Sequence, residues 1–130
     1  MFGWKEMADT VASVYQRLTP EEQSRCGIYA DNYGEAAAID FFGRKYGLPH
    51  AISGHNSYWF WGPGNTTGEV MIVIGGELQE HQQFYSGECR QEAVIQNENA
   101  RSFEIDLPVF VCRQLKKPIA EVWPLTRAFI

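Results

Sequence analysis

The stretch Glu69-Val70-Met71-Ile72-Val73-Ile74-Gly75-Gly76 is the starting point for our prediction of the fold. After Glu69 it is an uninterrupted apolar run rich in β-branched residues, which is typical of a strand that is buried on both faces. The glycine pair then ends the strand. We therefore expect a sheet whose centre contains this segment and whose two sides are both covered.

Apolar spacing and capping signals place two helices and a strand ahead of this segment. Residues 4–18 carry apolar side chains every three or four positions, which predicts an amphipathic helix. Thr19-Pro20-Glu21-Glu22 forms a capping box that opens a short extra turn. A buried strand is expected at 25–30. A second helix follows at 35–46, and Gly47 closes it as a left-handed cap.

Further strands are expected at 50–53, 88–96 and 107–112, with a third helix at 77–84 and either a short helix or an extended arm at the end of the chain. Because strands that are separated by helices favour parallel pairing, we predict one α/β domain over residues 1–130. Its expected architecture is a three-layer, mostly parallel sheet of the flavodoxin or Rossmann kind, with helices on both faces. The last two strands could pair as an antiparallel edge.

The composition is that of a folded, soluble protein, with 45% hydrophobic and 21% charged residues in a chain of 130. There are 11 basic and 16 acidic residues, which gives a net charge of −5, and no run of lysine and arginine is longer than a doublet such as Lys116-Lys117. This balance argues against nucleic-acid binding. Apolar runs such as 70–74 are too short to cross a bilayer, and the N-terminus lacks the layout of a signal peptide.

The chain has three cysteines, at Cys26, Cys89 and Cys112. An odd number without C-x-x-C spacing argues against a disulfide framework or a zinc site. Cys26 and Cys112 fall in strand-like runs, where a cysteine is expected to be a small buried hydrophobe. His50, His55 and His81 show no helical or hairpin ligand spacing, so we expect no metal site.

In an open parallel sheet, ligands bind beyond the carboxyl ends of the strands. Small or polar residues follow three of the expected strands, so we predict that they meet at one edge. The candidate binding residues at this edge are Asn32, Tyr33, Glu35, Ser53, His55, Asn56, Tyr58 and Trp59. The chain has no G-x-G-x-x-G at a strand–helix turn and no G-K-[ST], which argues against a nucleotide cofactor, and we expect no cofactor of any kind.

Two features of this edge are open to more than one interpretation. His55 and Glu35 could form an acid–base pair, although a structural role is favoured, in which His55 binds loop backbone while Asp31 and Asn32 cap the second helix. The aromatic run at 58–61 suits contacts with a sugar or a protein as well as it suits packing against the sheet.

Several stretches together resemble the C-terminal soluble region of bacterial multi-spanning membrane glycosyltransferases, which are related to dolichyl-phosphate-mannose–protein mannosyltransferases. These stretches are Phe2-Gly3-Trp4-Lys5-Glu6-Met7, Asn32-Tyr33-Gly34-Glu35-Ala36-Ala37-Ala38-Ile39-Asp40, Tyr46-Gly47-Leu48-Pro49, Ser53-Gly54-His55-Asn56-Ser57-Tyr58-Trp59-Phe60-Trp61-Gly62-Pro63 and Leu107-Pro108-Val109-Phe110-Val111-Cys112-Arg113. The similarity runs nearly end to end and is weakest at 77–106. Ala37 stands where the family pattern leads us to expect glycine.

The resemblance implies a domain beyond the last membrane helix, on the extracytoplasmic face of the bacterial inner membrane. Family members transfer a sugar from a polyprenyl-phosphate donor to an acceptor. Their catalytic carboxylate belongs to an early loop between membrane helices, which has no counterpart here. The implied role is therefore a non-catalytic accessory domain, whose partners are the membrane-embedded part of the same parent protein and a glycan or acceptor. Met1 would then not be the natural beginning of the protein.

Two other classes of function remain as alternatives. The first is a free-standing small enzyme that uses Glu35 and His55 in proton transfer. The second is an interaction module whose aromatic run docks on the loops of a membrane domain.

Overall fold

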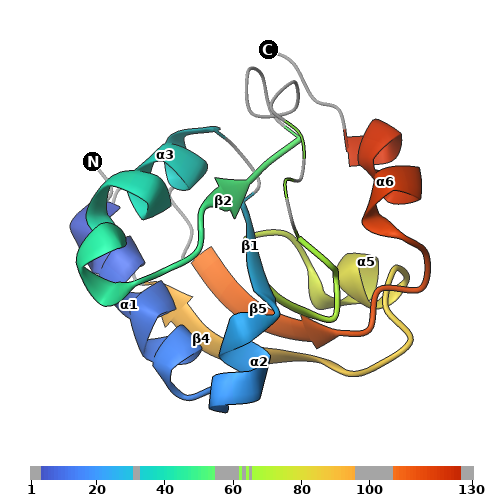
Figure 1. Cartoon of the computed structure of the whole chain (residues 1–130), viewed down its shortest axis with the longest axis horizontal. Coiled ribbons are helices and arrows are strands. Elements are labelled where there is room, and N and C mark those ends of the chain that lie inside the picture. Colours follow the sequence, from blue (N-terminus) through green and yellow to red (C-terminus); the bar gives the residue numbers. More distant parts are fainter. Residues whose placement is uncertain are drawn as a thin grey trace, which may run out of the picture.

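A five-stranded open sheet in the order β2-β1-β3-β5-β4 forms the centre of the computed structural model (Figure 1). The structure describes residues 4–30, 33–54, 62, 64, 66–95 and 107–126, with the backbone alone at Tyr33. The strands are β1 (Cys26–Ala30), β2 (Ala51–Ile52), β3 (Val70–Ile74), β4 (Cys89–Ile95) and β5 (Leu107–Arg113).

The centre of the sheet is parallel, and one side of it is antiparallel. β1 pairs in parallel with both β2 and β3, and Ile28 stands opposite Ile72 of β3. β5 then runs antiparallel to β3 and to β4. The predicted α/β class, the parallel strands and the antiparallel edge are thus confirmed. β5 lies between β3 and β4 because the chain crosses over from β3 to the edge and returns through a hairpin-like pairing.

Two helices cover one face of the sheet, which we call the α1 face. Helices α1 (Trp4–Gln16) and α3 (Tyr33–Phe42) pack against each other and on this face (Figure 1). The helix predicted at 4–18 is confirmed, and its apolar stripe is buried as expected. The largest side chains that are completely or almost completely buried here are Met7, Val11, Val14, Ile28, Ile39, Ile72, Ile74, Val109 and Val111.

Shorter elements lie over the opposite face, which we call the α5 face. They are helices α5 (Leu78–Gln82) and α6 (Ile119–Val122) and the 3₁₀ helix η2 (Trp123–Thr126). Because successive side chains of a strand point to opposite faces, Met71 and Val73 of β3 and Phe110 of β5 belong to this side. Every residue of β3 is buried, which confirms the prediction of a strand covered on both faces.

Helix boundaries differ from the prediction where glycine intervenes. The helix expected at 35–46 starts at Tyr33, ends at Phe42 and continues after Gly43 as the 3₁₀ helix η1 (Arg44–Tyr46). A Cβ on Gly43 would lie 2.5 Å from the carbonyl oxygen of Ile39, so only glycine allows the close turn there. Gly47 has φ +70°, which confirms the left-handed cap.

The capping box around Thr19 is confirmed and starts the short helix α2 (Pro20–Ser24). The Thr19 side chain accepts from the Glu22 amide, and the Glu22 side chain accepts from the Thr19 amide. Arg113 Nε, at the end of β5, lies 3.0 Å from Glu22 Oε2. The box thus fixes the start of α2 and also holds the helix to the sheet.

The prediction that Cys112 is only a small buried hydrophobe is corrected. Cys112 stands opposite Cys89 in the register of β4 and β5, and the two form a disulfide. The sequence did not reveal this bond, because cysteines that are 23 positions apart can be recognised as partners only when the register of β4 and β5 is known. Cys26 is the free cysteine of the chain.

Candidate functional site

The parallel pairing brings the carboxyl ends of β1, β2 and β3 to one edge of the sheet, as the sequence predicted. Of the candidate residues at this edge, Glu35 and Ser53 are buried, with 4% and 0% of their surface exposed. No buried side-chain nitrogen or oxygen in the described residues lacks a hydrogen-bond partner. Glu35 and Ser53 are therefore satisfied interior groups, a description that fits support of the edge better than direct contact with a ligand.

The other predicted site residues lie wholly or partly outside the described part of the chain. Tyr33 starts α3, and its side chain lies outside the description. The remaining ones, Asn32, His55, Asn56, Tyr58 and Trp59, lie outside the described residues. The acid–base pairing of Glu35 with His55 accordingly stays a prediction.

A pocket of about 430 Å³ opens on the α5 face, and we call it the α5–η2 pocket. Its volume is in the range of sites that bind small molecules. It is lined by Tyr29, Met71, Val73, Glu80, His81, Phe84, Tyr85, Leu115, Ile119, Val122, Trp123, Leu125 and Thr126. The strands supply the floor, and α5, α6 and η2 supply the walls.

The pocket reaches the edge where the parallel strands end. Thr126, at the end of η2, lies against Gly54, which follows β2 by two positions: a Cβ on Gly54 would come within 1.7 Å of the Thr126 carbonyl oxygen. On the other wall, His81 of α5 contacts Gly75, the first residue after β3. The pocket thus lies beside the predicted binding edge and shares its boundary with it.

Aromatic rings form much of the pocket. Tyr29, from β1, is half-buried, whereas Tyr85 and Trp123 are 9% and 8% exposed. Burial raises the pKa of the Tyr85 hydroxyl, and the nearby Tyr29 hydroxyl raises it further. The two phenols are therefore close neighbours, and the Tyr85 hydroxyl stays a neutral donor and acceptor at ordinary pH. Phe84 is 43% exposed at the mouth.

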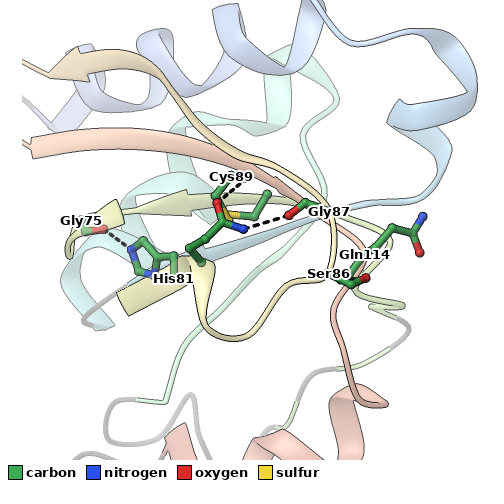
Figure 2. Close-up of a disulfide and its surroundings, with 8 residues drawn as sticks. Gly75, His81, Ser86, Gly87, Cys89 and Gln114 are labelled. Carbon is green, nitrogen blue, oxygen red and sulfur yellow. Dashed lines mark hydrogen bonds between the residues drawn. A yellow bond between two sulfur atoms is a disulfide. The ribbon is translucent and has the colours of Figure 1, made fainter. Parts of the chain in front are cut away.

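Glu80 and His81 are the carboxylate and the imidazole of this pocket. His81 Nε2 lies 2.8 Å from the carbonyl oxygen of Gly75 (Figure 2). The His81 ring also packs edge-on against Phe110, with 5.1 Å between the ring centroids. A carbonyl can only accept, so Nε2 carries the proton, and in the neutral ring Nδ1 is then an acceptor. Glu80 is exposed at the pocket's rim.

A second set of contacts fixes α5 beside the disulfide. The Gln82 side chain donates from Nε2 to the Gly87 carbonyl at 2.9 Å and accepts from the Cys89 amide at 3.1 Å. Just beyond, Ser86 donates from its hydroxyl to the Gln114 carbonyl (Figure 2). The helix that carries Glu80 and the histidine is only five residues long, so these contacts supply the rigidity that its length does not.

The histidines do not form a metal site in the part of the chain that is described. His50 precedes β2, is largely exposed and has Nδ1 3.5 Å from Asp40 Oδ1, whereas His81 lies beyond the opposite end of the parallel strands. No group of three or more histidine, cysteine, aspartate or glutamate side chains that could hold a metal occurs among the described residues. None of the described helices is long and apolar enough to cross a membrane.

Sequence reasoning missed the α5–η2 pocket, although part of the signal was present. The two-residue period of strands places Tyr29, Met71 and Val73 on one face, which could have been read from the sequence. The return of Trp123 and Leu125 over that face could not, because it depends on how the chain turns after β5. His81 was considered only as a metal ligand.

Comparison of the chain with protein-family models, with curated proteins and with solved structures finds no match.

Proposed function

We propose that this chain is an extracytoplasmic accessory domain of a membrane glycosyltransferase that uses a polyprenyl-phosphate-linked sugar donor. In this proposal the domain has no catalytic activity of its own and binds a glycan or glycan acceptor in the α5–η2 pocket. The observation that carries the proposal is the combination of aromatic rings and hydrogen-bond acceptors in that pocket, at the edge where the parallel strands end.

This combination suits a sugar for a physical reason. A pyranose ring has apolar C–H faces that pack on aromatic rings, and its hydroxyl groups donate to carboxylates and ring nitrogens. Tyr29, Tyr85 and Trp123 offer the first kind of contact, and Glu80 and His81 offer the second. The extended resemblance in sequence, from Phe2 to Arg113, supports the same class of parent protein.

The disulfide supports the extracytoplasmic location. Structural disulfides form and persist in oxidising compartments, such as the bacterial periplasm, and are rare in the cytosol. The bond between Cys89 and Cys112 joins two strands of the sheet beside the base of α5. A domain on the outer face of the inner membrane would meet the conditions under which this bond forms.

The finer description of the fold, a three-layer sheet of the flavodoxin or Rossmann kind, also belongs to the proposal. Its support is the presence of two separate apolar clusters on the two faces, one under α1 and α3 and the other under α5, α6 and η2. The short α5 and α6 would then be the reduced second layer of helices.

Sugar binding is testable by NMR on the 130-residue chain, with mannose, glucose and galactose as probes. We expect amide shifts at Glu80 and His81 and an indole shift at Trp123. Replacing Phe84 by alanine should weaken binding roughly three- to tenfold, through loss of a stacking surface at the mouth. Phe41→Ala is the matched control, because Phe41 is a 73% exposed ring on α3, away from the pocket.

Two results would refute the proposed site. The first is the absence of saturable shifts at the pocket with any of these sugars. The second is a set of shifts confined to the amino-terminal edge of the parallel strands, around His50. The relation to a membrane enzyme is tested separately: the coding sequence upstream of Phe2 should encode membrane helices in the same reading frame.

A further inference from the structure

We propose that the α5–η2 pocket selects a sugar that carries an amine over neutral and acidic sugars. This inference rests on the proposed function, since it names the ligand class of the same site. It follows from the sign of the charge and the kind of hydrogen-bonding groups that the pocket offers.

The charged group on the lining is negative. Glu80 contributes a carboxylate, and none of the described residues that line the pocket is a lysine or an arginine. The chain as a whole has a net charge of −5. An ammonium group is attracted to such a lining, whereas the carboxylate of an acidic sugar would meet a like charge.

The polar groups at α5 are arranged to accept. Since Nε2 of His81 donates to Gly75, Nδ1 of the neutral ring is an acceptor. The Glu80 carboxylate accepts as well, and it belongs to no ion pair among the described residues. An ammonium group brings three donors and no acceptor, and it therefore suits a lining that offers acceptors better than a hydroxyl does.

The aromatic rings favour the same ligand. A cation that lies over the face of tryptophan or tyrosine is attracted by the ring's quadrupole, and the attraction grows when water is excluded. Tyr29, Tyr85 and Trp123 all line the pocket, and the last two are almost completely buried. An amine that enters the pocket can thus exchange part of its hydration for ring faces and a carboxylate.

The basic doublet Lys116-Lys117 lies near the mouth but outside the lining. The Lys116 amide donates to the Phe84 carbonyl, and the side chains of Lys116 and Lys117 are exposed. The charges of Lys116 and Lys117 act on any part of a ligand that extends past Phe84, whereas Glu80 is the carboxylate of the lining itself. The test therefore includes an acidic sugar, which the lysines would favour if they dominated.

The experiment compares glucosamine with glucose, N-acetylglucosamine and glucuronic acid, in NMR titrations of the whole chain at neutral pH, where most of the amine is protonated and an ordinary imidazole is mostly neutral. Glucosamine and glucose differ only in an ammonium group for a hydroxyl. We expect glucosamine to bind about threefold more tightly than glucose, which is the size of effect that a partly exposed charge pair produces. Glu80→Gln should abolish that preference.

Glu77→Gln is the matched control, because Glu77 is exposed beside the same helix but does not line the pocket. It should keep the preference for glucosamine. Equal binding of glucosamine and glucose, tighter binding of glucuronic acid, or a preference that survives in Glu80→Gln would overturn the inference while leaving sugar binding intact. Failure of every sugar to move the pocket signals would instead remove the proposed function itself.

Discussion

The carbonyl oxygen of Thr126 occupies the space in which a side chain at Gly54 would begin: a Cβ there would lie 1.7 Å from it. This contact seats the end of η2 against the residue that follows β2 and Ser53. It is the point at which the pocket and the edge predicted from the sequence meet. The last helical turn of the described chain therefore depends on a glycine more than seventy positions earlier.

Gly54→Ala should displace η2 from the strand ends. Because backbone atoms are in the way, the added methyl group cannot be accommodated by a change of rotamer. We expect a loss of about 1–3 kcal/mol in the free energy of unfolding, the usual cost of overpacking. Denaturant titration measures the loss, and NMR should show amide shifts at Trp123 and Thr126.

Gly47→Ala serves as the comparison for this variant. Gly47 has φ +70° with nothing within 4 Å of an added Cβ, so its replacement strains the backbone without a clash. It should cost about 1 kcal/mol and leave the signals of η2 in place. If Gly54→Ala is as stable as the parent chain and the Thr126 signals do not move, Gly54 is not in close contact with the end of η2.

The disulfide should contribute measurably to stability. The paired cysteines are 23 positions apart, and cross-linking a loop of that size restricts the unfolded chain by about 3 kcal/mol. The double variant with Cys89→Ala and Cys112→Ala, or reduction of the parent chain, should lower the free energy of unfolding by this order. Cys26→Ala, which leaves the bond intact, should remain sensitive to reduction. If reductant leaves the unfolding midpoint of the parent chain unchanged, Cys89 and Cys112 are not joined by a disulfide.

The reading of the fold from the sequence succeeded where the signal is local. The apolar run at 70–74 and the capping box at Thr19 each depend on neighbours a few positions away, and both are confirmed. The direction of the strands could also be predicted, because a helix between two strands leaves room for a parallel return. Helix lengths were less accurate, since α5 ends at Gln82 under the control of contacts with β4.

The candidate site was predicted only in part, because its parts meet through long-range packing. The common edge of β1, β2 and β3 follows from topology and was foreseen. The wall of the pocket does not: Trp123 and Thr126 reach it only after the chain has left β5 and crossed the α5 face. The pairing of Tyr85 with Leu115 at the base of the pocket is equally non-local. No spacing rule along the chain encodes such contacts.

Cys26 should resist modification although it is the free thiol of the chain. Its burial raises the pKa of the thiol to about 12, from an ordinary value of 9.0. A rise of about three units in the pKa means about a thousandfold less thiolate at any pH below both the ordinary and the raised pKa. Alkylation by iodoacetamide at mildly alkaline pH should therefore be slow in the folded chain and fast in denaturant. Equal rates in the two states would contradict the burial of this residue in β1.

The ion pair between Glu22 and Arg113 should make stability depend on pH in a defined direction. Hydrogen bonds from the Thr19 amide and then from Arg113 lower the pKa of Glu22 below its ordinary value of 4.5. Since the folded chain holds this carboxylate ionised more strongly than the unfolded chain, the stabilisation is present above that value and is lost as the pH falls through the lowered folded pKa.

Glu22→Gln should accordingly cost about 0.5–1 kcal/mol at neutral pH, where the pair is partly exposed to solvent, and the cost should shrink toward acid. Glu21→Gln, on the same turn of α2 and exposed, is the control and should change stability little at any pH. Denaturant unfolding measured from neutral to acidic pH gives both curves. A penalty for Glu22→Gln that stays constant across this range would show that the carboxylate acts by packing or by its hydrogen bonds as a neutral group. In that case the charge pair with Arg113 would not be what holds α2 to β5.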